Sequence, residues 1–300
     1  MQIAQSTHRH WRGSRLALGI LLIVGNLAPV PACSEPNTRL HYAPNHNFDA
    51  HGQYLPGKAG FNLADVGDVQ ELDSLPNGVK ALVWIGQCNG VDDTFLKTVQ
   101  PFIGHPKVFG FYLVDEPDPR GRRSAPCTAD SLRAESDWIH AHAADAKTFI
   151  VLINLGTSDA PSFLNTYNRA NSHIDLFGID PYPCRTDMDT CELEMIDRYV
   201  AAAEAWGISR SDIVPVYQTF GGGDWNDDRG GKYTLPTADQ MNQMMERWGT
   251  IIPAPVFDYA YSWGIQNGDE ALENAPQLQA VFTRHNKPSS NPGDRSDVAR

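Results

Sequence analysis

The fold is decided by the segment Phe109-Gly110-Phe111-Tyr112-Leu113-Val114-Asp115-Glu116-Pro117. Six residues that favour a buried strand lead into two carboxylates, and a proline then ends the element. A continuous apolar run is typical of a parallel strand that is covered on both faces. The two acids therefore follow the carboxyl end of the strand, where α/β barrels carry their active sites. The alternative is a strand that ends in a solvated acidic turn, and the rest of the chain must distinguish the two.

Strand-like and helix-like segments alternate from residue 60 onward, and apolar residues recur at helical spacing in the intervening segments. This alternation predicts parallel βαβ units. Eight units in about 250 residues predict a single (β/α)8 TIM barrel over residues 38–286. The predicted strands are 40–43, 61–66, 81–86, 108–114, 148–155, 174–179, 213–220 and 256–263, and the predicted helices are 92–103, 129–144, 192–206 and 238–251.

The first βα unit is the weak point of the barrel prediction, because residues 44–60 show no helical pattern. An irregular first unit or a seven-stranded barrel therefore stays open. An open, doubly wound sheet is the other alternative. It is disfavoured because no Gly-x-Gly-x-x-Gly turn follows any predicted strand.

The two ends of the chain are expected to lie outside the barrel. Residues 1–32 begin with a basic region, continue with a short apolar run and end with small residues typical of a cleavage site, which together predict a secretory signal. The apolar run is too short for a stable membrane span, although an N-terminal anchor helix is the alternative. The segment also resembles a bacterial lipoprotein signal, which implies lipidation of Cys33. Residues 287–300 are rich in Pro, Ser, Asp and Arg and predict a disordered tail.

The four remaining cysteines are an even number in an exported chain, which predicts two disulfides. Cys184 and Cys191 are close together in one loop, and this leaves Cys88 to pair with Cys127. Metal binding is the alternative, but neither a Cys-x-x-Cys motif nor clustered histidines support it. We expect no metal and no cofactor.

The composition is that of an ordinary globular protein with an acidic surface. The 300 residues are 41% hydrophobic and 20% charged, and the formal net charge is −12. An acidic surface argues against nucleic acid or an anionic membrane surface as a partner and fits a neutral or cationic ligand. We expect an exported monomer that contacts a membrane only through an N-terminal lipid.

Polar and aromatic side chains recur where the predicted strands end. Aromatic faces stack on the apolar face of a pyranose, while amides and acids bind its hydroxyl groups, so this pattern predicts a sugar site. The candidate catalytic residues are Glu116, Asp115 and Asp180. The candidate substrate-binding residues are Asn62, Asp65, Trp84, Tyr112, Asn154, Tyr182, Gln218, Trp225, Tyr261 and Trp263.

The chain resembles the clan A glycoside hydrolases and their distant barrel relatives. The matching segments are Tyr112-Leu113-Val114-Asp115-Glu116-Pro117, Tyr261-Ser262-Trp263-Gly264 and, more loosely, Asp180-Pro181-Tyr182-Pro183. The resemblance implies that Glu116 is the general acid/base. It also implies that Trp263 lines the subsite beside the scissile bond.

The chain departs from that clan at the seventh strand, where the clan carries its nucleophilic glutamate and this sequence has Gln218. Glycoside hydrolysis normally uses two carboxyl groups. Asp180 is the best substitute for the missing acid, and Asp115, Asp65 and Asp224 are the alternatives.

Neighbouring residues on a strand point to opposite faces. Only one of Asp115 and Glu116 is therefore expected to face the site, unless the strand has already ended. Two functions follow from these observations. The first is a secreted or lipid-anchored glycosidase acting on a polysaccharide or oligosaccharide of the cell envelope or the extracellular space. The second, motivated by Gln218, is a barrel that binds carbohydrate without catalysis.

Overall fold

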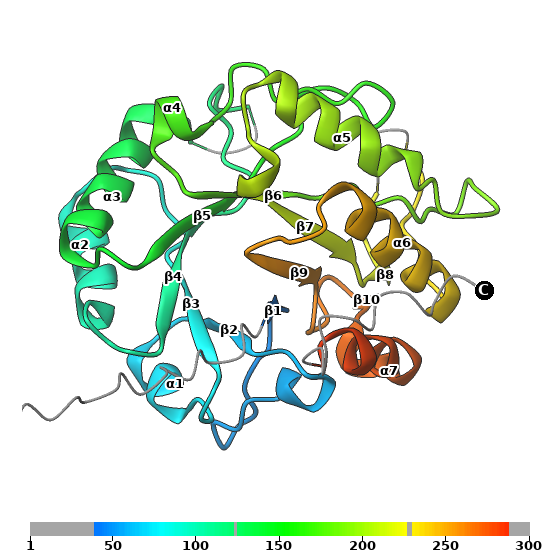
Figure 1. The fold of residues 1–300 in the computed structure, drawn as a ribbon, viewed down its shortest axis with the longest axis horizontal. Helices are drawn as coiled ribbons and strands as arrows, with labels where there is room; N and C mark the ends of the chain where they lie inside the picture. The colour runs from blue at the N-terminus through cyan, green and yellow to red at the C-terminus, as the bar shows by residue number, and fades with distance from the viewer. Residues whose placement is uncertain (1–38, 123–124, 227–229, 288–300) are drawn as a thin grey trace, which may run out of the picture. The chain divides into compact units, whose positions relative to one another are not determined.

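A computed structural model describes residues 39–122, 125–226 and 230–287. Eight parallel strands close into a barrel in the order β1-β2-β3-β4-β5-β6-β7-β9, with helices arranged around the outside (Figure 1). The predicted (β/α)8 barrel is therefore confirmed. Its strands are β1 Leu40–Tyr42, β2 Leu63–Val66, β3 Lys80–Trp84, β4 Val108–Val114, β5 Lys147–Val151, β6 Leu176–Ile179, β7 Ile213–Gln218 and β9 Phe257–Tyr261.

Each of the four predicted helices is present, and three further α-helices occupy segments where none was predicted. The α-helices are α1 Val69–Ser74, α2 Asp93–Val99, α3 Ala129–His142, α4 Arg169–Ser172, α5 Glu194–Ala205, α6 Ala238–Ile251 and α7 Pro276–His285. Short 3-10 helices are η1 Pro56–Ala59, η2 Gln100–Phe102, η3 Arg210–Asp212 and η4 Leu272–Asn274.

The first βα unit is irregular, because only the 3-10 helix η1 lies between β1 and β2. The barrel nevertheless closes with eight strands. Strand β1 pairs with β2 on one side and with β9 on the other, where Leu40 faces Phe257 and Tyr42 faces Tyr259. A missing helix in one unit therefore does not open the sheet.

Side chains that alternate along the strands divide the core into two layers. The inner layer fills the barrel and includes Tyr42, Tyr112, Phe149, Val216 and Tyr259. The outer layer packs the strands against the helices. Because every strand runs in the same direction, all eight carboxyl ends meet at one rim.

A small antiparallel pair, β8 Gly221–Gly222 and β10 Asp269–Glu270, joins two loops at this rim. A Cβ atom added at Gly221 would lie 1.8 Å from the backbone nitrogen of Leu235. Only glycine at position 221 allows the backbone around Leu235 to come this close. The loop that carries Trp225 is therefore held at one end by the β8–β10 pair and at the other by this approach.

Both predicted disulfides are present, between Cys88 and Cys127 and between Cys184 and Cys191. Within the described residues, no helix combines the length and the hydrophobicity that crossing a bilayer requires. The predicted signal peptide, the lipidated Cys33 and residues 288–300 of the predicted tail lie outside the described residues.

Candidate active site

Three carboxylates from two strand ends open into one cavity of about 380 Å³. Strand β4 ends at Val114, so Asp115 and Glu116 lie in the turn that follows it. Glu116 has a φ of 40°, in the left-handed region that non-glycine residues seldom adopt. The strand alternation no longer applies here, and both acids line the same cavity as Asp180, which follows β6.

Aromatic rings form much of the wall of this first cavity. Tyr182 stacks on Tyr261, with ring centroids 6.1 Å apart and an interplanar angle of 29°. Phe220 meets Tyr182 edge-on at 4.9 Å and lies 6.2 Å from Trp225. Rings beside convergent carboxylates are the combination that sugar binding requires.

A second cavity of about 320 Å³ adjoins the first and shares Asp115 and Tyr261 with it. Asp65 lines it and accepts hydrogen bonds from the Tyr42 hydroxyl at 3.1 Å and from the backbone N–H of Asn45 at 3.2 Å. Trp84, 38% exposed, also lines this cavity. We call the two cavities together the cleft.

Burial changes the acidity of the cleft carboxyl groups. It raises the pKa of Asp180 well above its ordinary value, and the charges of Glu116 and then Asp115 raise it further. Burial also raises the pKa of Asp115, although the Tyr112 hydroxyl donates a hydrogen bond to its Oδ1 at 2.6 Å. The pKa of Asp65 is raised for the same reason. Burial therefore favours the protonated form of each of these three carboxyl groups.

Asn62 is the first predicted site residue that the structure places elsewhere. It precedes β2, at the amino end of the strand. Its Nδ2 donates to the carbonyl oxygen of Arg39 at 3.1 Å, and its Oδ1 accepts from the N–H of His41 at 2.8 Å. These bonds tie β1 to β2, and Asn62 lines neither cavity of the cleft.

Gln218 was also predicted to bind substrate, and the structure places it away from the cleft. Its side chain is completely buried. The amide accepts from the N–H of Cys184 at 2.9 Å and donates to the carbonyl oxygens of Cys184 and Thr234, each at 2.9 Å. Gln218 therefore holds together the two loops that cover it, and it lines neither cavity.

Trp263 does not line the cleft either. It is fully buried in the outer core, 6.4 Å from the ring of Phe61, and the Lys58 ammonium lies 4.9 Å from its ring centroid. Strand β9 has ended two residues earlier, and Tyr261 is the residue that faces the cleft. Asp224, one of the alternatives for the second acid, is likewise absent from the lining of both cavities.

Asn154 lines the first cavity, but its side chain forms most of its hydrogen bonds within its own loop. Its Oδ1 accepts from the N–H groups of Gly156 and Ser162, both at 2.9 Å. Its Nδ2 donates to the Tyr199 hydroxyl at 3.0 Å. Asn154 therefore shapes this part of the wall.

Four tyrosines that line the cleft are not among the predicted site residues. Tyr42 and Tyr259 line the second cavity, whereas Tyr199 and Tyr233 line the first. Tyr42 ends the short first strand, so the strand-end pattern could have found it. Tyr199 comes from α5 and Tyr233 from the loop before α6, and neither position carries a strand-end signal.

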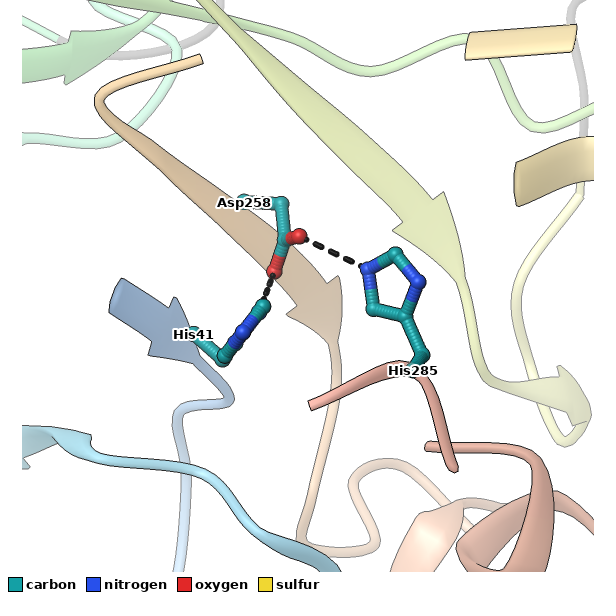
Figure 2. Close-up of side chains that lie close together, drawn as sticks. All are labelled: His41, Asp258 and His285. Carbon is teal, nitrogen blue, oxygen red and sulfur yellow. Dashed lines mark hydrogen bonds and ion pairs between the residues drawn. The ribbon is translucent and has the colours of Figure 1, made fainter. Parts of the chain in front are cut away.

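Histidines cluster at one place, which the sequence did not suggest. Asp258 lies between His41 and His285, with Oδ1 2.8 Å from Nδ1 of His41 and Oδ2 2.9 Å from Nε2 of His285 (Figure 2). One ligand atom from each residue falls within 4.8 Å of the others, a donor set that divalent metals also use. Here the carboxylate already pairs both imidazoles, and none of the three residues lines the cleft.

A further hollow of about 590 Å³ lies between α1 and α2. None of the predicted site residues lines it. Apart from Trp263 and the alternative acid Asp224, the carboxylates and rings of the predicted sugar site line the cleft at the strand ends.

No protein-family model and no curated protein sequence matches this chain. Among solved structures, the barrel is similar to endo-glycoceramidase II from Rhodococcus sp., with a TM-score of 0.53 and 12% identity over 82% of this chain and 78% of that one. It is also similar to the GH18 chitinase ChiB of Flavobacterium johnsoniae, with a TM-score of 0.52 and 10% identity over 84% and 94% of the two chains. The chain therefore has the fold of the TIM-barrel glycosidases.

Proposed function

We propose that the protein is a glycoside hydrolase in which Glu116 is the general acid/base and Asp180 the second carboxylate. The observation that carries this proposal is the meeting of Asp115, Glu116 and Asp180 in one aromatic-walled cavity at the carboxyl ends of the strands. Asp180 takes the second role because it lines the same cavity as Glu116 and is close enough for the charges of the two carboxyl groups to interact. Glycoside cleavage normally uses two carboxyl groups placed around the scissile bond.

The test is hydrolysis of a panel of extracellular and cell-envelope glycans by the purified protein. Glu116→Gln keeps the shape of the side chain but removes the transferable proton, so turnover should fall by about two to four orders of magnitude. Asp180→Asn should cause a comparable loss. Asp145→Asn, at an exposed position in the loop before β5 and thus at the opposite end of the strands from the cleft, is the control and should leave turnover unchanged. Near-normal turnover in Glu116→Gln would contradict the proposal.

A barrel that binds carbohydrate without cleaving it is the second candidate. It is favoured by one observation, the buried structural amide of Gln218 at the strand end where the clan carries its nucleophile. Saturable binding of an oligosaccharide, together with no cleavage of any glycan in the panel, would support this second function.

We further propose that the protein is exported, with residues 1–32 as the signal and Cys33 at or near the mature N-terminus. The two disulfides support this proposal, because such bonds persist in oxidising compartments. The intact mass of the protein recovered from the cell envelope or the medium tests the cleavage site and the lipid together.

A further inference from the structure

Negative charge gathers in the second cavity of the cleft. Two of the residues that line this cavity, Asp65 and Asp115, carry carboxyl groups. Among the described residues that line it there is no lysine, arginine or histidine.

Basic residues in loops near the rim interact away from the cleft. The Nζ of Lys232 donates to the carbonyl oxygen of Gly223 at 2.6 Å. The Nδ1 of His46 lies 3.8 Å from the Glu273 carboxylate. Neither Lys232 nor His46 lines the second cavity, where a ligand could supply the cation that its described lining lacks.

The second cavity is where a ligand cation fits best. Asp65 and Asp115 both line it, each accepting a hydrogen bond from a tyrosine hydroxyl. An ionised carboxylate can accept about four hydrogen bonds, so these contacts leave acceptor capacity on both side chains. The partly exposed ring of Trp84 lies in the same cavity and offers a face on which a pyranose can stack.

We propose, resting on the glycosidase function above, that the cleft takes a glycan of amino sugars with free amino groups, and that Asp65 and Asp115 hold a protonated amine in the second cavity. An ammonium group offers three donors, and its hydrogen bonds to a carboxylate are about twice as strong as neutral ones. It also offsets the free-energy cost of burying these carboxylates in their charged form, and a neutral hydroxyl offsets less of that cost. Carboxylated or sulfated glycans would meet like charges and be rejected.

The decisive experiment compares oligosaccharides that differ only in this charge. Binding is measured by calorimetry with Glu116→Gln protein, which should leave the oligomers intact. The probes are β-1,4-linked glucosamine and α-1,4-linked galactosamine oligomers, each beside its fully N-acetylated form. In at least one pair, the free amine should bind about tenfold more tightly, the usual advantage of a charge-assisted hydrogen bond.

Two further measurements assign that preference to the second cavity. Asp65→Asn should remove it, whereas the exposed control Asp145→Asn should keep it. In the Glu116→Gln protein with Asp65 intact, raising the pH until the amine is neutral should also remove the preference. This measurement does not depend on the folding of Asp65→Asn.

Four outcomes would each overturn the inference. The two members of both pairs could bind equally, the acetylated forms could bind more tightly, or none of the four oligomers could bind. The fourth outcome is a preference that survives in folded Asp65→Asn. The wild-type protein separates this failure from failure of the proposed function. Cleavage of acetylated oligomers without any amine preference would leave the glycosidase standing, while an amine preference without cleavage would leave only the binding site.

Discussion

Burial and neighbouring negative charge both raise the pKa of the Asp180 carboxyl group. The charge of Glu116 contributes to its raised pKa, second only to burial. Glu116→Gln removes that charge, so we expect the pKa of Asp180 to fall in this variant while burial still keeps it raised. Carboxyl-carbon NMR titration, assigned with Asp180→Asn, measures the change. Asp115→Asn should produce a smaller fall, and an unchanged pKa in Glu116→Gln would show that the two acids do not interact.

Gln218 presents a second single-residue question, since its position suggests a lost nucleophile. Its Nε2 donates to the carbonyl oxygens of Cys184 and Thr234. In Gln218→Glu an ionised carboxylate would face those oxygens in a buried site. We expect this variant to gain no activity and to lose about 3 kcal/mol of unfolding free energy in urea denaturation. Gln100→Glu, at an exposed position, should be neutral, and a stable Gln218→Glu protein with increased turnover would refute the structural role.

Among the secondary-structure elements, β1, β9 and α7 depend on one another through the cluster of His41, Asp258 and His285 (Figure 2). Burial alone would raise the pKa of the Asp258 carboxyl, but the two imidazoles, with His41 contributing most, hold it well below its usual range. A lowered folded-state pKa stabilises the protein at pH values above the unfolded value of about 3.9. That stabilisation is lost as the pH falls below this value toward the folded pKa.

We therefore expect Asp258→Asn to lose about 3 kcal/mol of unfolding free energy at pH 7, because one of two paired imidazoles loses its acceptor. Urea denaturation between pH 7 and pH 3 measures the loss. The difference from the wild type should shrink below about pH 4. Asp145→Asn is the matched control, and a difference that stays constant with pH would contradict the assignment to Asp258 ionisation.

For the molecule as a whole, the barrel could be predicted because its determinants are local. The apolar run 108–114 predicts a strand, and the amphipathic run 129–144 predicts a helix. The alternation of strands and helices along the chain is then compatible with few folds. Helix α4 has only four residues, Arg169–Ser172, and begins with an Asn168 cap rather than an apolar stripe. Hydrophobic periodicity could not reveal an element that short.

The candidate site was predictable only where the strand end alone fixed a side chain. Asp115, Glu116 and Asp180 follow directly from the ends of β4 and β6. Gln218 ends its strand in the same way, yet loops more than fifteen residues away in sequence cover it. Tyr199 reaches the cleft from a helix. Burial of this kind depends on tertiary packing, which a one-dimensional pattern does not contain.

The pairing of β1 with β9 closes the barrel into a continuous ring of strands. The position of the two chain ends within this ring therefore does not decide which strands pair. Near these ends, Nδ2 of Asn286 donates to the carbonyl oxygen of Ala59 at 3.0 Å, so the last helix and the first loop already touch. A circular permutant that links residue 287 to residue 39 and opens instead at the exposed positions 144 and 145 would keep every strand pair. We expect it to melt within a few degrees of the parent, and its new ends would leave from the loop between α3 and β5, at the face opposite the cleft.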